Sequence, residues 1–120
     1  MKLDATVVVV APDRELRRSI EFLLQAEGFQ VVSLARLPLR GNEIWPRNGC
    51  AVVDENAILA EADGWTSLAT MPQPVVLLTD RIRHIPDRYA GGAVTKPLLG
   101  RGLLDAVSNA LEQVRHPTAT

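Results

Sequence analysis

A carboxylate, a hydroxyl and an ammonium group each come directly after a short apolar run of this chain. They are Asp54 after Cys50–Val53, Thr79 after Val75–Leu78, and Lys96, followed by Pro97, after Ala93–Thr95. Such runs are typical of strands buried on both faces of a parallel sheet, whose carboxyl ends meet at one edge. A carboxylate there, beside a hydroxyl and an ammonium group, suits reversible phosphorylation of Asp54. Phosphoryl transfer needs positioning and charge neutralisation more than covalent help.

Strand and helix patterns alternate along the chain. Five apolar runs predict strands at Thr6–Val10, Phe29–Leu34, Cys50–Val53, Val75–Leu78 and Ala93–Thr95. Helical spacing predicts a first helix that is capped by Asp13 and stops at Gly28, and a last helix from about Gly100 to Arg115. Strands alternating with helices indicate an α/β fold, a doubly wound parallel sheet with helices on both faces.

The helices between these two are expected to be short or broken. Segments 35–49 and 81–90 contain prolines, including Pro86 in the second, so we expect shortened second and fourth helices. Ala57–Met71 predicts a helix that is interrupted near Gly64.

Length and composition predict one globular domain. The chain has 120 residues, 47% of them hydrophobic, and a net charge of −1. We expect residues 1–116 to form the domain and 117–120 to be a frayed tail or the start of a linker. The single Cys50 excludes disulfides within the chain and is expected to be a small buried hydrophobe. Trp45 and Trp65 are expected at the margin of the core.

The setting is expected to be cytoplasmic. No stretch approaches the ~18 apolar residues of a membrane span. The apolar run near the N-terminus is too short for a signal peptide. A lone cysteine fits a reducing compartment.

The chain resembles the receiver domain of bacterial two-component response regulators over nearly its whole length. Four segments carry the resemblance in order: Val7–Arg18, Ala51–Asp54, Val75–Thr79 and Gly92–Leu98. The resemblance implies a flavodoxin-like, five-stranded parallel sheet with strand order 2-1-3-4-5.

The resemblance also implies a role for each matching residue. Asp54 would accept a phosphoryl group from a histidine kinase or a phosphotransfer domain. Thr79 and Lys96 would each contact a phosphoryl oxygen, and Pro97 would fix the peptide after the lysine. The backbone carbonyl of Asn56 would be a ligand for Mg²⁺.

Three positions depart from the receiver pattern. The family places two adjacent acids after the first strand, and here those positions hold Ala11 and Pro12. The aromatic residue three before the lysine is Ala93. Mg²⁺ is usually held by one or two carboxylates plus phosphate oxygens, so we expect weak binding or none. Asp13 lies one residue too late to replace the acids and is better explained as the helix cap.

Each candidate residue also has a simpler interpretation. Asp54 could cap the turn into the next helix, and Thr79 could be an ordinary hydroxyl at the end of a strand. Lys96 could form a standing salt bridge to Asp54 that holds the site in one state. In that case we expect Lys96→Ala to destabilise the fold.

Two functional classes follow from these residues. We favour a degenerate receiver that works through protein contacts with little or no phosphorylation; the alternative is a working receiver phosphorylated on Asp54. The partner of this chain would be a histidine kinase, a phosphotransfer domain or a constitutive protein, and a homodimer is a further alternative.

Nucleotide, metalloprotease and hydrolase motifs are absent, so we expect no organic cofactor and no enzyme beyond self-catalysed phosphoryl transfer. An unrelated flavodoxin-like enzyme is a third alternative, and it would carry a flavin or nucleotide. No DNA-recognition helix is apparent.

Overall fold

A parallel sheet dominates the computed structural model, which describes residues 6–37, 49–69, 74–79, 93–95 and 100–115. Its strands are β1 (Thr6–Val10), β2 (Gln30–Leu34), β3 (Cys50–Asp54), β4 (Val75–Thr79) and β5 (Ala93–Thr95). The helices are α1 (Arg14–Ala26), α2 (Glu55–Leu59), α3 (Gly64–Ala69) and α5 (Gly100–Arg115).

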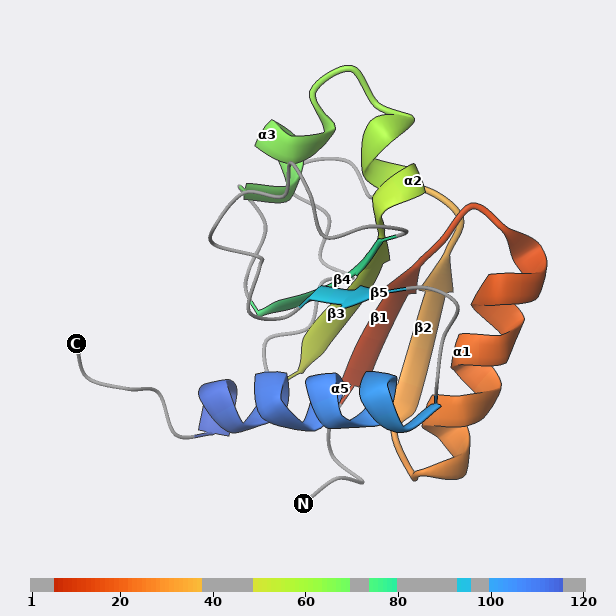
Figure 1. The fold of residues 1–120 in the computed structure, drawn as a ribbon, viewed down its shortest axis with the longest axis vertical. Coiled ribbons are helices and arrows are strands. Elements are labelled where there is room, and N and C mark those ends of the chain that lie inside the picture. Colours follow the sequence, from red (N-terminus) through yellow and green to blue (C-terminus); the bar gives the residue numbers. More distant parts are fainter. Residues whose placement is uncertain (1–5, 38–48, 70–73, 80–92, 96–99, 116–120) are drawn as a thin grey trace.

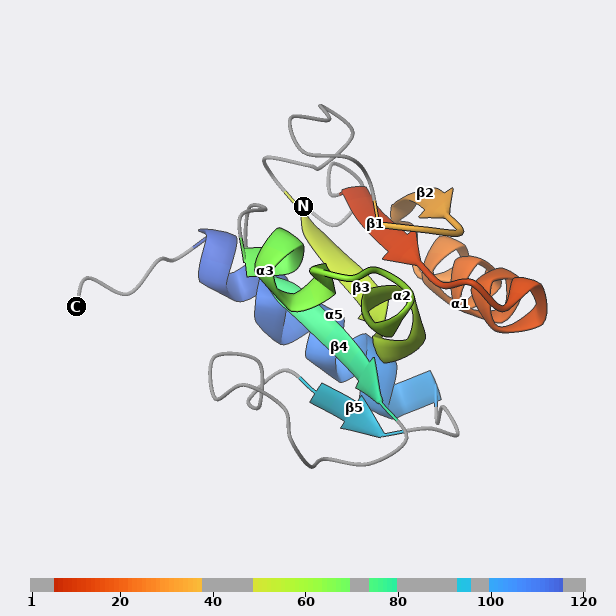
Figure 2. The same cartoon turned by 90° about the horizontal axis from the view of Figure 1, so that it is seen from above.

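The strand order of the sheet is β2-β1-β3-β4-β5, and every neighbouring pair is parallel. Figures 1 and 2 show the strands running in one direction, with α1 between β1 and β2 and with α2 and α3 between β3 and β4. The predicted α/β, doubly wound arrangement with order 2-1-3-4-5 is therefore confirmed. The chain places β2 on one side of β1 and β3 on the other, so the switch point of the sheet lies between β1 and β3. Open sheets of this kind bind ligands at that point, beyond the carboxyl ends of the strands.

Helices α1 and α5 cover one face of the sheet. Their buried side chains form a core cluster with alternate residues of β1, β3 and β4. Its fully buried members include Ile20, Leu24, Leu103, Val107 and Val9. Because successive strand residues point to opposite faces, this cluster uses only every second position of each central strand.

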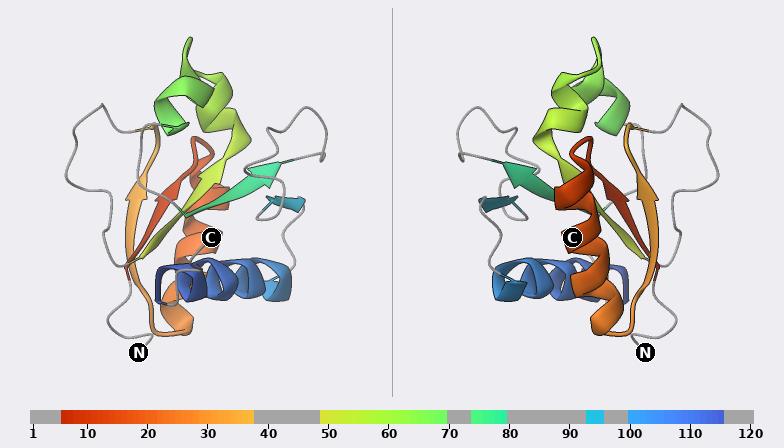
Figure 3. Two further views of the ribbon diagram at one scale, coloured as in Figure 1. Left: turned by 90° about the vertical axis from the view of Figure 1, so that its left-hand side faces the viewer. Right: turned by 90° about the vertical axis from the view of Figure 1, so that its right-hand side faces the viewer.

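Helices α2 and α3 cover the other face. Val10 and Val53 of the sheet pack there with Ala57 and Ile58 of α2 and with Leu68 of α3. Figure 3 shows both short helices, in green, at the end of the molecule toward which the arrows of β1 and β2 point. The central strands are thus buried on both sides, as their continuous apolar runs predicted.

The first helix begins and ends where its sequence predicts. The carboxylate of Asp13 accepts hydrogen bonds from the backbone N–H groups of Glu15 at 2.9 Å and Leu16 at 3.2 Å, which makes it the N-cap. After the helix, Gly28 has a φ of 94°, a conformation that glycine adopts without strain.

The helix predicted over Ala57–Met71 is two shorter helices. The first begins at Glu55, two residues earlier than expected, because Asp54 serves as its N-cap. The second begins at Gly64, whose backbone lies so close to α2 that a side-chain carbon would clash with the carbonyl oxygen of Ile58. The break near Gly64 therefore reflects the close approach of the two helices.

Two predictions about single residues are confirmed. Cys50 is buried in β3, and Trp65 is half-buried against the α2–α3 side of the core. Trp45, most of segment 35–49, segment 81–90 and the tail 117–120 lie outside the described residues. Among the helices that the structure describes, none is both long and apolar enough to cross a bilayer.

Candidate functional site

Strand register places the candidate residues at one edge of the sheet. Val10 lies opposite Val53, so Ala11 and Asp54 come next on adjacent strands, which are about 4.8 Å apart in such sheets. Asp54 itself lies opposite Leu78, one residue before Thr79. The sheet thus brings the end of β1, Asp54 and Thr79 together, as their positions after apolar runs predicted.

Asp54 is the last residue of β3 and is 0% exposed. Its Oδ1 atom accepts a hydrogen bond from the backbone N–H of Asn56 at 3.1 Å, the bond of a helix N-cap. The capping role that the sequence left open is therefore present. It secures α2 at the carboxyl edge of the sheet.

Thr79 is also fully buried, and its hydroxyl donates a hydrogen bond to Oε1 of Glu55 at 2.9 Å. Glu55 is half-buried and directly follows Asp54 in the chain. Glu55 is not among the site residues predicted from the sequence. The available signal was its place as a second carboxylate after the same buried strand, where the register of β3 and β4 brings it within reach of Thr79.

The guanidinium group of Arg17 forms hydrogen bonds with the turn after β1. Arg17 reaches back from α1, and its Nη1 donates to the carbonyl oxygen of Ala11 at 2.8 Å and, at a longer 3.5 Å, to that of Pro12. Ala11 is buried and Pro12 is exposed, and neither side chain carries a polar group. The turn after β1 therefore has a guanidinium bonded to its backbone, a contact that the sequence did not predict.

Comparison with known proteins gives one consistent result at the level of the fold. No protein-family model matches this chain. The transcriptional regulator protein FixT of Rhizobium meliloti (strain 1021) is 29% identical over 106 residues, which cover 87% of this chain and 90% of FixT. The signal receiver domain of a modulated diguanylate cyclase from Desulfovibrio desulfuricans G20 superimposes with a TM-score of 0.72, at 20% identity over 92% of this chain and 95% of that domain. The chain has the receiver fold of response regulators.

A second solved structure agrees on the receiver fold. The response regulator StyR superimposes with a TM-score of 0.69 and 23% identity over 92% of this chain. The chain covers only 61% of StyR, so it corresponds to part of that protein. The resemblance to receiver domains that the sequence indicated is thus confirmed in the fold.

The structure places some of the predicted site residues and leaves others outside its described ranges. Asp54 and Thr79 lie together at the carboxyl edge, whereas Lys96 and Pro97 lie outside the described residues. Ala93, at the position of the receiver aromatic, is half-buried and packs against the core on the side of α2 and α3.

The remaining two predicted residues take part in helix capping. The backbone N–H of Asn56 donates to Asp54, while its carbonyl oxygen accepts from the N–H of Ala60 at 3.1 Å. Asp13 caps α1. Within the described ranges, no three His, Cys, Asp or Glu side chains gather as metal ligands.

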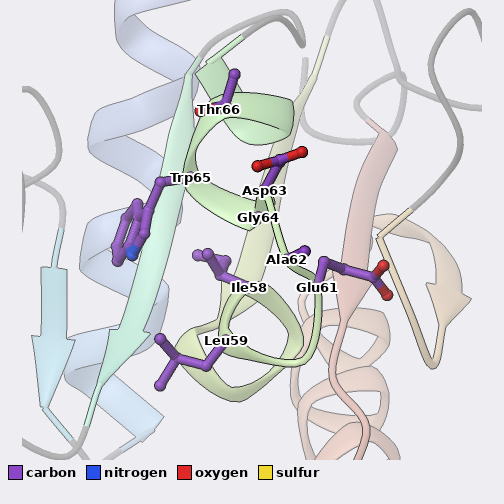
Figure 4. A pocket seen from close by; sticks show the side chains of 8 residues that line it. All are labelled: Ile58, Leu59, Glu61, Ala62, Asp63, Gly64, Trp65 and Thr66. Carbon is purple, nitrogen blue, oxygen red and sulfur yellow. The ribbon is translucent and has the colours of Figure 1, made fainter.

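A hollow of about 420 Å³ lies beside α2 and α3. Figure 4 shows that Trp65 and Glu61 point to opposite sides of it, so polar groups do not converge there on a common point. Glu61 instead lies 3.7 Å from Arg36, whose side chain is 81% exposed. The hollow therefore lacks the converging polar groups of a small-molecule site.

Cys50 is the one cysteine of the chain and lies in the middle of the sheet. Burial raises the pKa of its thiol from 9.0 to about 12. A thiol that stays protonated is a poor nucleophile. Cys50 is therefore a packing residue.

Proposed function

We propose that this chain is a receiver domain of two-component signalling that acts through protein contacts, with little or no phosphorylation of Asp54. The observation that carries the proposal is that groups of the carboxyl edge bond to one another within the domain. Asp54 caps α2, Thr79 donates to Glu55, and Arg17 binds the carbonyl of Ala11. The receiver fold and the similarity to FixT support the signalling role.

The donor set does not fit a magnesium ion. Mg²⁺ loses its water reluctantly and is usually held by carboxylates together with phosphate oxygens. Ala11 and Pro12 supply no carboxylate, and the carbonyl oxygen of Ala11 already accepts from a guanidinium. A divalent cation at this turn would also be repelled by Arg17. Phosphorylation would then lack the metal charge that neutralises the transferred group.

Lys96 is the strongest candidate for a charge partner of Asp54. It directly follows β5, and Thr95 at the end of β5 pairs in register with Thr79. We expect the ammonium group to form a standing salt bridge with the buried carboxylate of Asp54. Such a pair would hold the site in one state without phosphate.

The expected partner is a signalling protein. The candidates are a histidine kinase, a phosphotransfer domain, a constitutive protein partner and a second copy of this chain. The candidate contact surface includes exposed residues of α5 such as Asp105, Ser108 and Asn109, while segment 81–90, the other candidate, lies outside the described residues.

A working phospho-acceptor is the second candidate function. The observation that favours it is the retained pair of Asp54 and Thr79 at the carboxyl edge. In that case a histidine kinase would phosphorylate Asp54 despite the altered turn after β1.

An NMR amide titration with beryllofluoride, with and without Mg²⁺, tests the proposal. Beryllofluoride binds a carboxylate as a mimic of the phosphoryl group, so a working site would show saturable, Mg²⁺-dependent shifts around Asp54, Thr79 and Lys96. We expect no such shifts at saturating reagent with the fold intact. Shifts that appear in the wild type and vanish in Asp54→Asn would establish the phospho-acceptor function instead.

A further inference from the structure

The hydroxyl of Thr79 has one proton to donate, and that proton is directed at Glu55. A threonine hydroxyl is a single donor with two acceptor lone pairs. Its Oγ1 lies 2.9 Å from Oε1 of Glu55. Donation to a phosphoryl oxygen on Asp54 would therefore require Thr79 to leave Glu55.

The hydrogen bond from Thr79 to Glu55 is strengthened by burial and by its carboxylate acceptor. Thr79 is 0% exposed, and Glu55 is half-buried. Hydrogen bonds to an ionised carboxylate are roughly twice as strong as those between neutral groups. A buried hydroxyl that lost its acceptor would also pay for its desolvation.

Helix α2 holds the backbone of Glu55 in place. Asp54 caps the helix through the N–H of Asn56, and Ala57 and Ile58 are buried against the sheet. Glu55, between the cap and these anchors, is thus kept beside the end of β4. The contact joins residues 24 apart in sequence, so it ties the start of α2 to the end of β4.

We propose that Glu55 is an internal substitute for a phosphoryl oxygen: its carboxylate accepts a hydrogen bond from the hydroxyl of Thr79 and fixes the end of β4 in one state without phosphorylation. The inference deepens the proposed function and rests on it. Glu55 also places a negative charge next to Asp54, which opposes the addition of a phosphoryl dianion there. Glu55 thereby holds the end of β4 in one state and disfavours phosphorylation of Asp54.

Two substitutions at Glu55 separate its role as an acceptor from its role in the fold. Glu55→Ala removes the acceptor, whereas Glu55→Gln keeps an oxygen that can accept from Thr79. Glu61→Ala is the control, because Glu61 pairs with the exposed Arg36 and not with Thr79. The readouts are the χ1 populations of Thr79, from three-bond NMR couplings, and the exchange rate of its hydroxyl proton with water.

We expect one rotamer of Thr79 in the wild type, in Glu55→Gln and in Glu61→Ala. In Glu55→Ala we expect Thr79 to average over several rotamers. Its hydroxyl proton should exchange faster by roughly tenfold, because the variant loses one hydrogen bond to a charged group. Amide dispersion checks that each variant is folded. If Glu55→Ala does not fold, Thr79→Val removes the donor in the same shape, and Glu55 should then become mobile by the same couplings.

The outcomes separate this inference from the proposed function. Unchanged Thr79 couplings and exchange in Glu55→Ala, with a wild type that is silent to beryllofluoride, would overturn the inference and leave the proposed function standing. A wild type that responds to beryllofluoride in an Mg²⁺-dependent way would overturn the proposed function and, with it, the inference. A silent wild type and a released Thr79 in Glu55→Ala support both.

Discussion

Nη1 of Arg17 donates a hydrogen bond to the carbonyl oxygen of Ala11 at 2.8 Å. This contact binds a permanent positive charge to the turn after β1, because an arginine stays protonated in proteins. A receiver holds acids and a metal at this turn. In this chain the guanidinium of Arg17 bonds to the backbone of the turn, and Ala11 and Pro12 supply no carboxylate.

Restoring the acids should restore a metal site. In the double variant Ala11→Asp, Pro12→Asp, two carboxylates return to the end of β1 next to Asp54. We expect Mg²⁺ affinity to rise on the order of tenfold or more, because Mg²⁺ prefers carboxylate oxygens. NMR titration with Mg²⁺, followed by beryllofluoride, measures the change.

The control for this variant is Asp54→Asn in the same background, which should abolish the beryllofluoride response while leaving part of the Mg²⁺ response. If the restored acids produce no Mg²⁺ response in a folded protein, the loss of the acids is not what disables the site.

A double-mutant cycle tests the expected pair of Lys96 and Asp54. Lys96→Met should lower the free energy of unfolding by roughly 3 kcal/mol, because it leaves the buried carboxylate of Asp54 without its partner. Asp54→Asn should lower it as well, because it removes the other half of the pair. The double variant should cost much less than the sum of the two. Urea unfolding measures all four proteins, and strictly additive costs would count against the pair.

Gly64 and Gly102 form a matched pair of substitutions to alanine. Gly64→Ala should destabilise the fold by about 2–3 kcal/mol, because the new carbon would clash with the backbone carbonyl of Ile58, which cannot move without shifting α2. Gly102→Ala, in α5 and with no atom within 4 Å of the new carbon, should stabilise by about 0.5–1 kcal/mol. Thermal and urea unfolding measure both, and effects of equal sign would contradict the packing of α2 against α3.

Cys50 should make stability fall at alkaline pH. Burial raises the pKa of its thiol to about 12 in the folded protein, from an ordinary value of 9.0. The folded state therefore keeps a proton that the unfolded state loses, and the stabilisation present below pH 9 is lost as pH rises through about 12. Urea midpoints at pH 8 and pH 10 for the wild type and Cys50→Ala measure it. An equal fall in both proteins would show that other groups are responsible.

The fold could be predicted from the sequence because its signals are local. Runs such as Val7–Val10 are typical of strands buried on both faces of a parallel sheet, and the Asp13 cap and Gly28 stop define α1. The helix predicted over Ala57–Met71 shows the limit. Its true start at Glu55 depends on Asp54 acting as a cap, and the chain alone did not decide between that role and others.

The sequence by itself determined the five-stranded parallel sheet and the placement of Asp54 and Thr79 at its carboxyl edge, because apolar periodicity and strand ends are properties of neighbouring residues. Only the tertiary structure decided which group each of these residues binds. The bonds from Thr79 to Glu55 and from Arg17 to Ala11 join different elements, and their existence depends on the register of the strands and on where α1 and α2 pack. A hydroxyl or guanidinium has many acceptors within reach in an unfolded chain, and packing selects the ones it bonds to in the folded protein.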